Sequence, residues 1–455
     1  MTLGTRNLAV LGSHLKGQLI GPDDAGYDEA RTVFSGEIDR RPSAIVRVAD
    51  ATDVARVVAW ARDNGYELAI RSGGHSGAGH SSTNGGIVLD LRHMKSLEID
   101  AAGRTAWAES GLTAGEFTTA AGAHGLATGF GDTGSVGIGG LTLGGGVGYL
   151  VRKYGLTIDS LLAADLVTAD GRLLRVDAQS HPDLFWAIRG GGGNFGVATR
   201  FQFHLDEVGA ILGGMLILPA SADVIASFIA EAESAPEELS TIANIMPAPP
   251  MPFLPPEHHG RLVVMAFLAH AGGGEAGERA VAPFRALAEP IVDMVRPMRY
   301  PEIYPPDDTS YHPTAVGRTM FVDEVRRTEA ETIVDQLQAS DASLRVAQLR
   351  VLGGAMARVP AEATAFAHRT SRILVNLAAF YDGPADRPRR EAWVAEFAAA
   401  LRQNDAGAYV NFLGDEGEAR IRQAYPGSTW ERLVEIKARY DPENLFRLNQ
   451  NIPRQ

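Results

Sequence analysis

Apolar and polar positions change their spacing repeatedly along the first two hundred residues, which predicts short strands alternating with helices. The apolar residues of 54–61 fall on one helical face, with Asp53 in front as the expected N-cap and Gly65 behind. We therefore expect a helix over 53–64. The other elements expected here are strands at 67–70 and 87–91, hairpins over 96–110 and 161–176, and helices at about 113–124 and 182–189. This pattern indicates an α+β domain.

Beyond about residue 205, glycine becomes rarer and long apolar runs appear. The strand-like runs are AILGGMLIL, RLVVMAFLA, LRVAQLRVL and RILVNLAAFY. Helical stretches such as TEAETIVDQLQAS separate them, which indicates one antiparallel sheet covered by helices. Long loops are expected at 247–256 and 300–313, where they border a substrate pocket. Near the C-terminus, Ser428 and Glu431 are spaced as the capping box of a further helix.

Length and composition are those of a multidomain globular protein. The 455 residues exceed the size of one ordinary core, which is about 250–300 residues. A net charge of -13 disfavours nucleic acid and anionic membranes as partners, because phosphates are bound by clustered Lys and Arg. No run approaches the roughly 18 apolar residues of a membrane span, and no secretory signal pattern is present. A cytoplasmic protein is expected, and an oligomer is possible.

Several common types of site are excluded or disfavoured by the sequence. Cysteine is absent, so disulfides, thiolate nucleophiles and Cys-bound metals are excluded. The adjacent His258 and His259 fit a solvated pair in a Pro-rich loop, and no metal is expected. Gly191, Gly193 and Gly196 have the GxGxxG spacing, but a helical pattern precedes them and a strand-like pattern follows. That order is the reverse of a Rossmann site and argues against a nicotinamide cofactor.

Three glycine-rich segments lie in the first domain, at 71–81, 131–148 and 190–197. Without Cβ atoms, consecutive backbone N–H groups approach an anion closely, which suits a pyrophosphate. Tight turns are the alternative explanation. Three such loops in one domain favour binding, since so much glycine would weaken an ordinary core.

These segments resemble the FAD-linked oxidases of the vanillyl-alcohol oxidase and p-cresol methylhydroxylase (PCMH) fold, in the berberine-bridge-enzyme-like branch. The resemblance covers nearly the whole chain and is carried by the loop at 71–81, the run GGLTLGGGVGYLVRKYGLTIDSL and the C-terminal YDPENLFRLNQNI. It implies a two-part, PCMH-type FAD-binding domain over 1–205 and a substrate-binding domain over 206–405. Residues 406–455 would return to the FAD-binding domain.

The resemblance implies that a ring nitrogen of His75 is joined to the 8α-methyl carbon of FAD. A neutral imidazole is nucleophilic enough for this bond, whereas a hydrogen-bonding histidine beside non-covalent FAD is the alternative. Many relatives make a second link from a cysteine where this chain has Thr133, so only a single linkage is possible, as in the bacterial 6-hydroxy-D-nicotine oxidases. His80 is interpreted as structural. The other expected FAD contacts are Arg71, Ser72, Gly73, Gly74, Ser76, Gly77, Thr133, Gly134, Gly137, Gly139, Gly140, Gly144, Gly193, Gly196, Val197, Asn411, Asn449 and Asn451.

The resemblance further implies hydride transfer from a small alcohol, sugar or amine to flavin N5, with O2 as the final acceptor. Gln348 and Arg350 share one face of an expected strand, although a solvent-facing sheet edge is the alternative. The candidate catalytic residues are Gln348, Arg350, Tyr381, Tyr409 and Asn411. Tyr409 and Asn411 are likewise paired by period two in AYVNFLG, as on one face of a strand, and the resemblance places them near the flavin ring. Tyr381 and His368 are candidate proton acceptors or buried structural residues. A dehydrogenase with a different electron acceptor and a non-catalytic flavin-binding protein remain alternatives.

Overall fold

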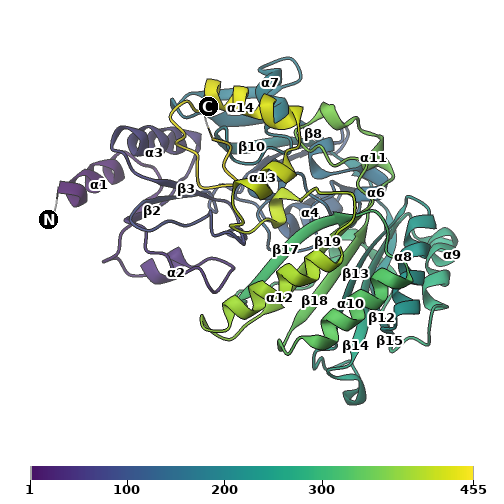
Figure 1. The fold of residues 1–455 in the computed structure, drawn as a ribbon. Coiled ribbons are helices and arrows are strands. Elements are labelled where there is room, and N and C mark those ends of the chain that lie inside the picture. Colours follow the sequence, from purple (N-terminus) through teal and green to yellow (C-terminus); the bar gives the residue numbers. More distant parts are fainter. Residues whose placement is uncertain (1–2, 454–455) are drawn as a thin grey trace.

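The computed structural model describes residues 3–453, and the first part of the chain forms two of its sheets (Figure 1). The four-stranded sheet has the order β1-β2-β4-β3, with β2, β4 and β3 parallel and β1 antiparallel at one edge. Its strands are β1 (Gln18–Ile20), β2 (Ala44–Arg47), β3 (Leu68–Arg71) and β4 (Ile87–Asp90). Helix α1 (Leu3–Ser13) precedes β1, α2 (Tyr27–Arg31) lies between β1 and β2, and α3 (Ala51–Asp63) connects β2 to β3.

Helix α3 begins earlier than the sequence predicts. Its N-cap is Asp50, whose side chain accepts hydrogen bonds from the backbone N–H groups of Thr52 and Asp53. The prediction of Asp53 as N-cap was therefore wrong. Asp53 is fully buried and accepts hydrogen bonds from the backbone N–H groups of Lys16 and Gly17, at 3.0 and 2.8 Å. This carboxylate fastens the N-terminal segment to the helix.

The second sheet confirms the expected hairpins and is antiparallel throughout, with the order β5-β6-β10-β8-β9. Its strands are β5 (Leu97–Asp100), β6 (Thr105–Glu109), β8 (Leu161–Val167), β9 (Leu173–Asp177) and β10 (Val197–His204). The helices that accompany it are α4 (Ala114–Gly122), α5 (Ile138–Gly144), α6 (Val151–Tyr154) and α7 (Pro182–Ala187). The glycine loop at 190–196 follows α7 and precedes β10, which confirms the reversed order that disfavours a Rossmann site.

The third sheet confirms the expected antiparallel architecture of the second half. Its order is β15-β12-β14-β13-β18-β19-β17, with β16 also paired to β12. The strands are β12 (Ala210–Pro219), β13 (Leu239–Pro247), β14 (Leu262–Ala271), β15 (Val292–Asp293), β16 (Arg296–Arg299), β17 (Ala315–Val322), β18 (Arg345–Val351) and β19 (Ile373–Phe380). Helices pack on one face and share its core, namely α8 (Ala222–Ser234), α9 (Gly274–Arg285), α10 (Arg327–Ala339) and α12 (Arg387–Ala400).

The two faces of strand β18 differ in chemistry. Ala347 and Leu349 belong to the core beneath the helices, whereas Gln348 and Arg350 occupy the opposite face. β18 lies between β13 and β19, so the alternative of a solvent-facing sheet edge is wrong. Gln348 is in register with Asn244 on β13 and Asn376 on β19. A row of three amide side chains therefore crosses the sheet on the face that bears no helices.

The C-terminal segment packs against the first part of the chain and also contacts strand β17 of the third sheet, where Arg420 donates to the Thr319 carbonyl at 2.5 Å. Its elements are η5 (Val410–Phe412), α13 (Glu418–Ala424) and α14 (Ser428–Tyr440). Trp430 and Leu433 share a hydrophobic core with residues of α7 and β10 (Figure 1). The expected capping box of α14 was wrong, since the N-cap is Gly427 and no side chain caps the helix. The domain limits themselves stay a prediction.

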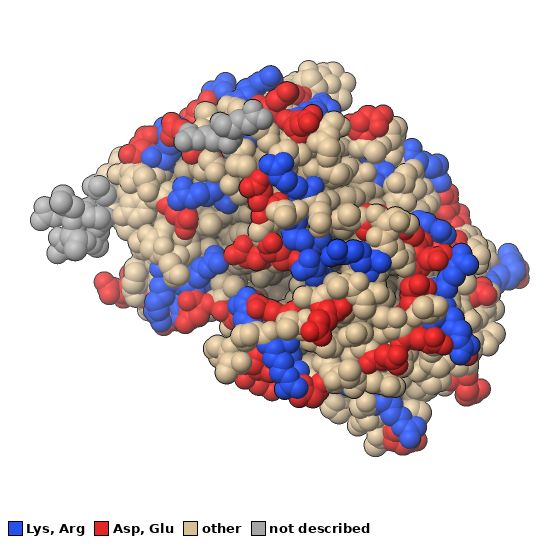
Figure 2. Space-filling view, in the orientation of Figure 1, with Lys and Arg blue, Asp and Glu red and all other residues tan. Residues whose placement is uncertain are grey.

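The molecular surface carries both signs of charge. On the face shown in Figure 2, basic and acidic side chains are interspersed around a hollow near the centre of the view. Within residues 3–453, no helix combines the length and the apolar character that a bilayer crossing requires.

Candidate functional site

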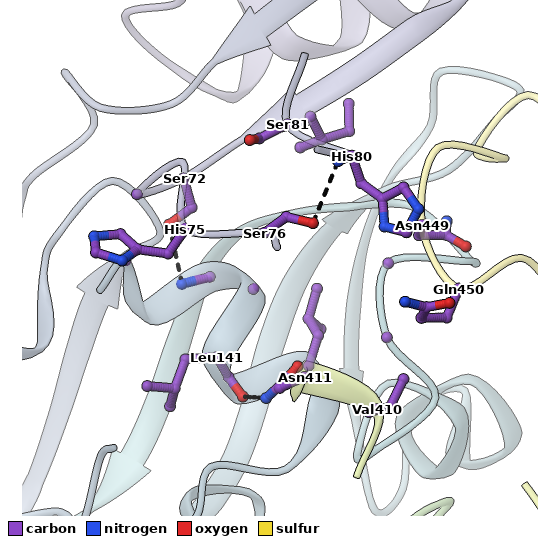
Figure 3. A pocket seen from close by; sticks show the side chains of 18 of the residues that line it. Ser72, His75, Ser76, His80, Ser81, Leu141, Val410, Asn411, Asn449 and Gln450 are labelled. Carbon is purple, nitrogen blue, oxygen red and sulfur yellow. Dashed lines mark hydrogen bonds between the residues drawn. The ribbon is translucent and has the colours of Figure 1, made fainter. Parts of the chain in front are cut away.

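The three glycine-rich loops and the C-terminal segment enclose a cavity of about 410 Å³. Figure 3 shows its side chains converging from separate elements: His75, Ser72 and Ser76 from one loop, Leu141 from α5, Asn411 from η5, and Asn449 from the C-terminal segment. The predicted residues that line the cavity are Ser72, Gly73, Gly74, His75, Ser76, Thr133, Gly137, Gly139, Gly140, Gly193, Gly196, Val197, Tyr409, Asn411 and Asn449. The structure thus brings together residues that are far apart in the sequence.

The first and second glycine loops touch through their backbones. A Cβ atom on Gly73 would lie 2.2 Å from the backbone nitrogen of Gly137, so a larger residue would force the loops apart. Ser72 reinforces this contact, because its hydroxyl donates to the Ser110 carbonyl at 2.6 Å and accepts from the Gly139 N–H at 3.2 Å. Gly73 and Gly137 therefore allow the backbones of the two loops to approach each other closely.

The third loop is held from behind by the C-terminal segment. The Asn194 amide donates to the carbonyls of Gly191 at 2.9 Å and Gln450 at 3.1 Å, and its oxygen accepts from the Ile452 N–H at 3.0 Å. Lys437, on α14, donates to the Asn194 carbonyl at 2.9 Å. The C-terminal signature therefore fixes the conformation of this glycine loop.

The cavity offers unpaired polar atoms and open backbone. Among the described residues, the buried Ser81 Oγ, Tyr425 Oη and Asn449 Oδ1 line the cavity and have no hydrogen-bond partner. A Cβ on Gly140 or Gly193 would meet only open space. Apolar lining comes from Leu68, Ile70, Leu91, Val197, Phe446 and Leu448. A large ligand with apolar rings and many polar groups, such as FAD, fits this mixture because buried polar atoms need partners.

His75 projects from the first loop at the cavity wall and is stacked on Phe34, with ring centroids 4.3 Å apart. Burial lowers the pKa of its imidazole to about 4, although the Asp307 charge and the Ser135 backbone oppose this shift. The ring is therefore neutral at cellular pH and available as a nucleophile.

His80 lies in the same loop and also lines the cavity. Its interpretation as a structural residue did not predict this position. Burial, together with the Arg40 charge, lowers the pKa of His80 to about 4. Its backbone N–H donates to Ser76 Oγ at 3.2 Å. Both imidazoles of the first loop are therefore neutral under cellular conditions.

A strand was expected for Tyr409 and Asn411, but the segment forms the short 3-10 helix η5 instead. Tyr409 directly precedes this helix, and Asn411 lies within it. The Tyr409 hydroxyl accepts hydrogen bonds from the Gly146 N–H and from the Asn411 amide, both at 2.9 Å. Asn411 also donates to the Leu141 carbonyl at 3.0 Å. A Cβ on Gly144 would lie 1.9 Å from the Asn411 oxygen, so this glycine makes room for the amide.

Arg350 connects the third sheet to the second glycine loop. It is only 4% exposed and pairs with Asp132, a cavity residue, at 2.5 Å. It also donates to the Gln348 side chain and to the Val147 carbonyl at 3.2 Å, and Gln348 donates to Asn244 at 2.9 Å. Arg350 thus lies behind the wall of the cavity and holds Asp132 in place.

Several predicted residues lie outside the cavity lining, namely Arg71, Gly77, Gly134, Gly144, Asn451, Gln348, Arg350 and Tyr381. Arg71 is fully buried and donates to the carbonyls of Ala30, Arg31 and Ser81, which indicates a structural role. Tyr381 donates a hydrogen bond to Glu37. Burial, followed by this bond to the Glu37 carboxylate, raises the pKa of the phenol to about 12.

His368 also lies outside the cavity lining. Its Nε2 is 3.1 Å from the Ala424 carbonyl oxygen, and its ring contacts the rings of Phe321 and Phe366. These contacts match the structural alternative for this histidine. Among residues 3–453, no cluster of three or more His, Asp or Glu could hold a metal ion.

The lining residues that the sequence did not predict include Phe34, Asp132, Tyr425 and Gln450. Asp132 lies in the second glycine-rich segment and Gln450 in the C-terminal signature. Their membership of these motifs could have predicted that they line the cavity. Phe34 lies in a segment without any motif, and no pattern in the sequence relates it to the first glycine loop.

Two family models match parts of this chain. The model of an FAD binding domain matches residues 42–177, which contain the first two glycine loops. The berberine and berberine-like model matches residues 408–453, the segment that closes the cavity.

Individual relatives extend the similarity over the whole chain. The (R)-6-hydroxynicotine oxidase of Paenarthrobacter nicotinovorans is 32% identical, covering 96% of this chain and 97% of its own. The FAD-linked oxidoreductase YgaK of Bacillus subtilis is 30% identical, with 96% and 97% covered. The structure of 6-hydroxy-D-nicotine oxidase from Arthrobacter nicotinovorans superimposes with a TM-score of 0.86 at 30% identity, over 96% of this chain and 98% of that one.

A more distant structure shows the same fold. Glucooligosaccharide oxidase from Acremonium strictum, described as carrying a 6-S-cysteinyl, 8α-N1-histidyl FAD, superimposes with a TM-score of 0.85 at 22% identity, over 99% of this chain and 100% of that one. From its glycine loops to its C-terminal signature, the chain belongs to the berberine-bridge-enzyme-like branch of the FAD-linked oxidoreductases with the PCMH-type fold.

Proposed function

We infer that the protein is an oxidase that binds FAD through a single covalent bond to His75 and oxidises a small alcohol, sugar or amine with O2. The observation that carries this inference is a neutral, half-buried imidazole at the wall of a cavity enclosed by three glycine loops. Thr133 lines the same cavity where many relatives have a second linking residue, and a threonine hydroxyl does not make that bond. The linkage is therefore single.

The chain's own residues fit the parts of the cofactor. Ser72, Gly73, Gly74 and Ser76 would hold the diphosphate, because they present a small hydroxyl or a bare backbone to the cavity. Asn411, fixed by the Leu141 carbonyl, would meet the ring system. When bound, FAD supplies the hydride acceptor and passes electrons to oxygen.

The substrate would bind between the cavity and the helix-free face of the third sheet. The row of Asn244, Gln348 and Asn376 on that face is uncharged, and amides both donate and accept. Gln348 already pairs with Asn244 and Arg350, so its remaining amide hydrogen and the Asn376 amide would face the substrate. Hydroxyl and amine groups both pair with amides, which agrees with a family that includes a hydroxynicotine oxidase and sugar oxidases. The row favours a substrate held by hydrogen bonds rather than by an ion pair.

Tyr409 would act next to the reacting atoms. Its oxygen already accepts two hydrogen bonds, from Gly146 and Asn411, so its own proton is directed elsewhere. Burial raises the pKa of this phenol, and the phenol therefore stays protonated at neutral pH. We assign Tyr409 the role of a hydrogen-bond donor that orients the substrate.

The test combines spectroscopy with oxygen consumption. Small alcohols, sugars and cyclic amines are added to the purified yellow protein, first without oxygen and then with it. We expect one class to bleach the flavin absorbance and then to drive O2 uptake with an equal amount of peroxide. Bleaching without oxygen uptake would instead show a dehydrogenase, and an unbleached flavin with every class would contradict an enzymatic role.

A further inference from the structure

The imidazole of His75 is packed under an aromatic ring from a different part of the chain. Phe34 follows helix α2 and lies nearly parallel to the His75 ring, with an interplanar angle of 20°. The Phe34 backbone N–H donates to the carbonyl of Gly74, the neighbour of His75, at 3.1 Å. The phenyl ring is therefore tied to the loop that carries the imidazole.

A loop from the second half of the chain lies over this pair. Residues 304–313 connect the short helix η3 (Tyr300–Ile303) to β17 and are fastened at both ends. At one end the Tyr304 hydroxyl donates to the Gly131 carbonyl at 3.1 Å. At the other end, the Gly36 N–H donates to the Pro313 carbonyl at 2.9 Å. The loop thus bridges the second glycine loop and the Phe34 segment.

Side chains between these two anchors contact Phe34 and its neighbour Val33. The Tyr311 ring meets the Phe34 ring edge-on, with centroids 6.1 Å apart, and the His312 Nδ1 atom is 2.9 Å from the Val33 carbonyl oxygen. Asp307 is close enough for its charge to act on His75. Phe34 and residues 304–313 together are called the cover below.

We propose that the cover prepares His75 for attachment to FAD and that Phe34 is a positioning residue for this step. The inference rests on the proposed covalent bond at His75. An uncovered imidazole rotates about its two side-chain torsions, whereas a ring held by stacking keeps one orientation. The cover also excludes water from one side of the ring, which keeps the nitrogen lone pair free of competing solvent.

The attachment step is balanced with oxygen as the oxidant. A ring nitrogen of His75 forms a bond to the 8α carbon; one C–H and one N–H bond break, and two protons and two electrons are released. These reduce one O2 to H2O2. Phe34 takes no part in the bond changes and acts only through the orientation of the imidazole.

The test compares full-length variants by the share of their FAD that stays with the chain after denaturation. Phe34→Ala is expected to retain FAD in the folded state, while its covalent attachment slows about tenfold, as expected from losing about 1.4 kcal/mol of ring stacking. Phe34→Tyr should attach FAD at the wild-type rate, because the stacked ring is kept. Phe253→Ala, on an exposed loop with the phenyl 40% exposed, is the matched control and should behave as wild type.

Two further variants test the role of the cover if Phe34→Ala folds poorly. Phe34→Leu keeps the apolar volume but removes the stacked ring, and Tyr311→Ala removes an exposed member of the cover. Both should slow attachment at unchanged FAD content. Wild-type attachment rates in Phe34→Leu and Tyr311→Ala would overturn the proposal, whereas a wild-type protein without covalent FAD would instead overturn the proposed function.

Discussion

Burial keeps His80 neutral at the cavity wall, which makes the folded protein sensitive to acid. Its pKa is 6.5 as an ordinary histidine and about 4 in the folded state. Below pH 6.5 the unfolded chain therefore binds a proton that the folded chain does not. The free energy of unfolding then falls by up to about 1.4 kcal/mol per pH unit until the pH nears 4.

His80→Gln should remove this contribution. Between pH 6.5 and 5, the wild type is expected to lose about 1.6 kcal/mol more stability than the variant. Urea unfolding of both proteins at the two pH values measures the difference. An identical loss in both would show that His80 takes up its proton equally in the folded and unfolded states.

The ion pair between Arg350 and Asp132 contributes to stability. Loss of the guanidinium in Arg350→Met leaves the Asp132 carboxylate, 25% exposed, without its partner. We expect unfolding to become easier by about 2 kcal/mol, less than for a fully buried pair. The double variant with Asp132→Asn should lose at least about 1 kcal/mol less than the sum of the single changes, because the two side chains interact directly. Additive effects in denaturant unfolding would contradict the pairing.

Single residues were predictable from the sequence where a motif fixes their surroundings. Ser72, His75 and Asn449 line the cavity as expected, since glycine spacing and the C-terminal signature are local patterns. Arg71 lies in the first glycine loop and Tyr381 ends a strand-like run, yet neither lines the cavity. Instead, Arg71 donates to backbone carbonyls and Tyr381 donates to Glu37, partners that only tertiary packing brings near. Phe34 reaches His75 only in the folded chain.

At the scale of elements, α14 and the third glycine loop depend on one another. Lys437 and Asp441 form an ion pair with both side chains fully buried, and Lys437 also donates to the carbonyls of Asn194 and Phe446. Burial lowers the pKa of Lys437, although Asp441 opposes the shift. The lysine thus joins the helix, the loop and the C-terminal signature.

Lys437→Met should disturb both stability and cofactor binding. It leaves a buried carboxylate unpaired, which costs about 3–5 kcal/mol, and it releases the loop around Asn194. We expect a lower melting temperature and a purified protein with much less FAD. Lys95→Met breaks a surface pair with Glu116, both about 40% exposed, and should change stability by less than about 1 kcal/mol. Equal effects of the two substitutions would refute the role of Lys437.

Most elements followed from the apolar spacing, and the exceptions have physical reasons. The segment 138–144 is rich in glycine, which disfavours a helix, yet it forms α5 because Ile138, Leu141 and Leu143 are buried in the surrounding core. The segment of η5 was expected to be a strand. Over only three residues, the alternation of a strand cannot be distinguished from a single 3-10 turn.

At the scale of the whole molecule, the cavity is made by segments more than 370 residues apart, from Ser72 to Gln450. Sequence patterns indicated the two architectures and the cofactor but not which loop of the second half would cover His75. That arrangement arises when the third sheet packs on the FAD-binding part, and the ion pair of Arg350 with Asp132 is one contact across this boundary.

The most direct test of the account is peptide mass mapping of the denatured, purified protein. We predict that FAD remains on the chain through denaturing electrophoresis, that one peptide containing His75 carries the mass of one FAD, and that His75→Ala releases its flavin on denaturation. Complete release of FAD from the wild-type chain, or its recovery on the peptide of another residue such as His80, would contradict covalent attachment at His75.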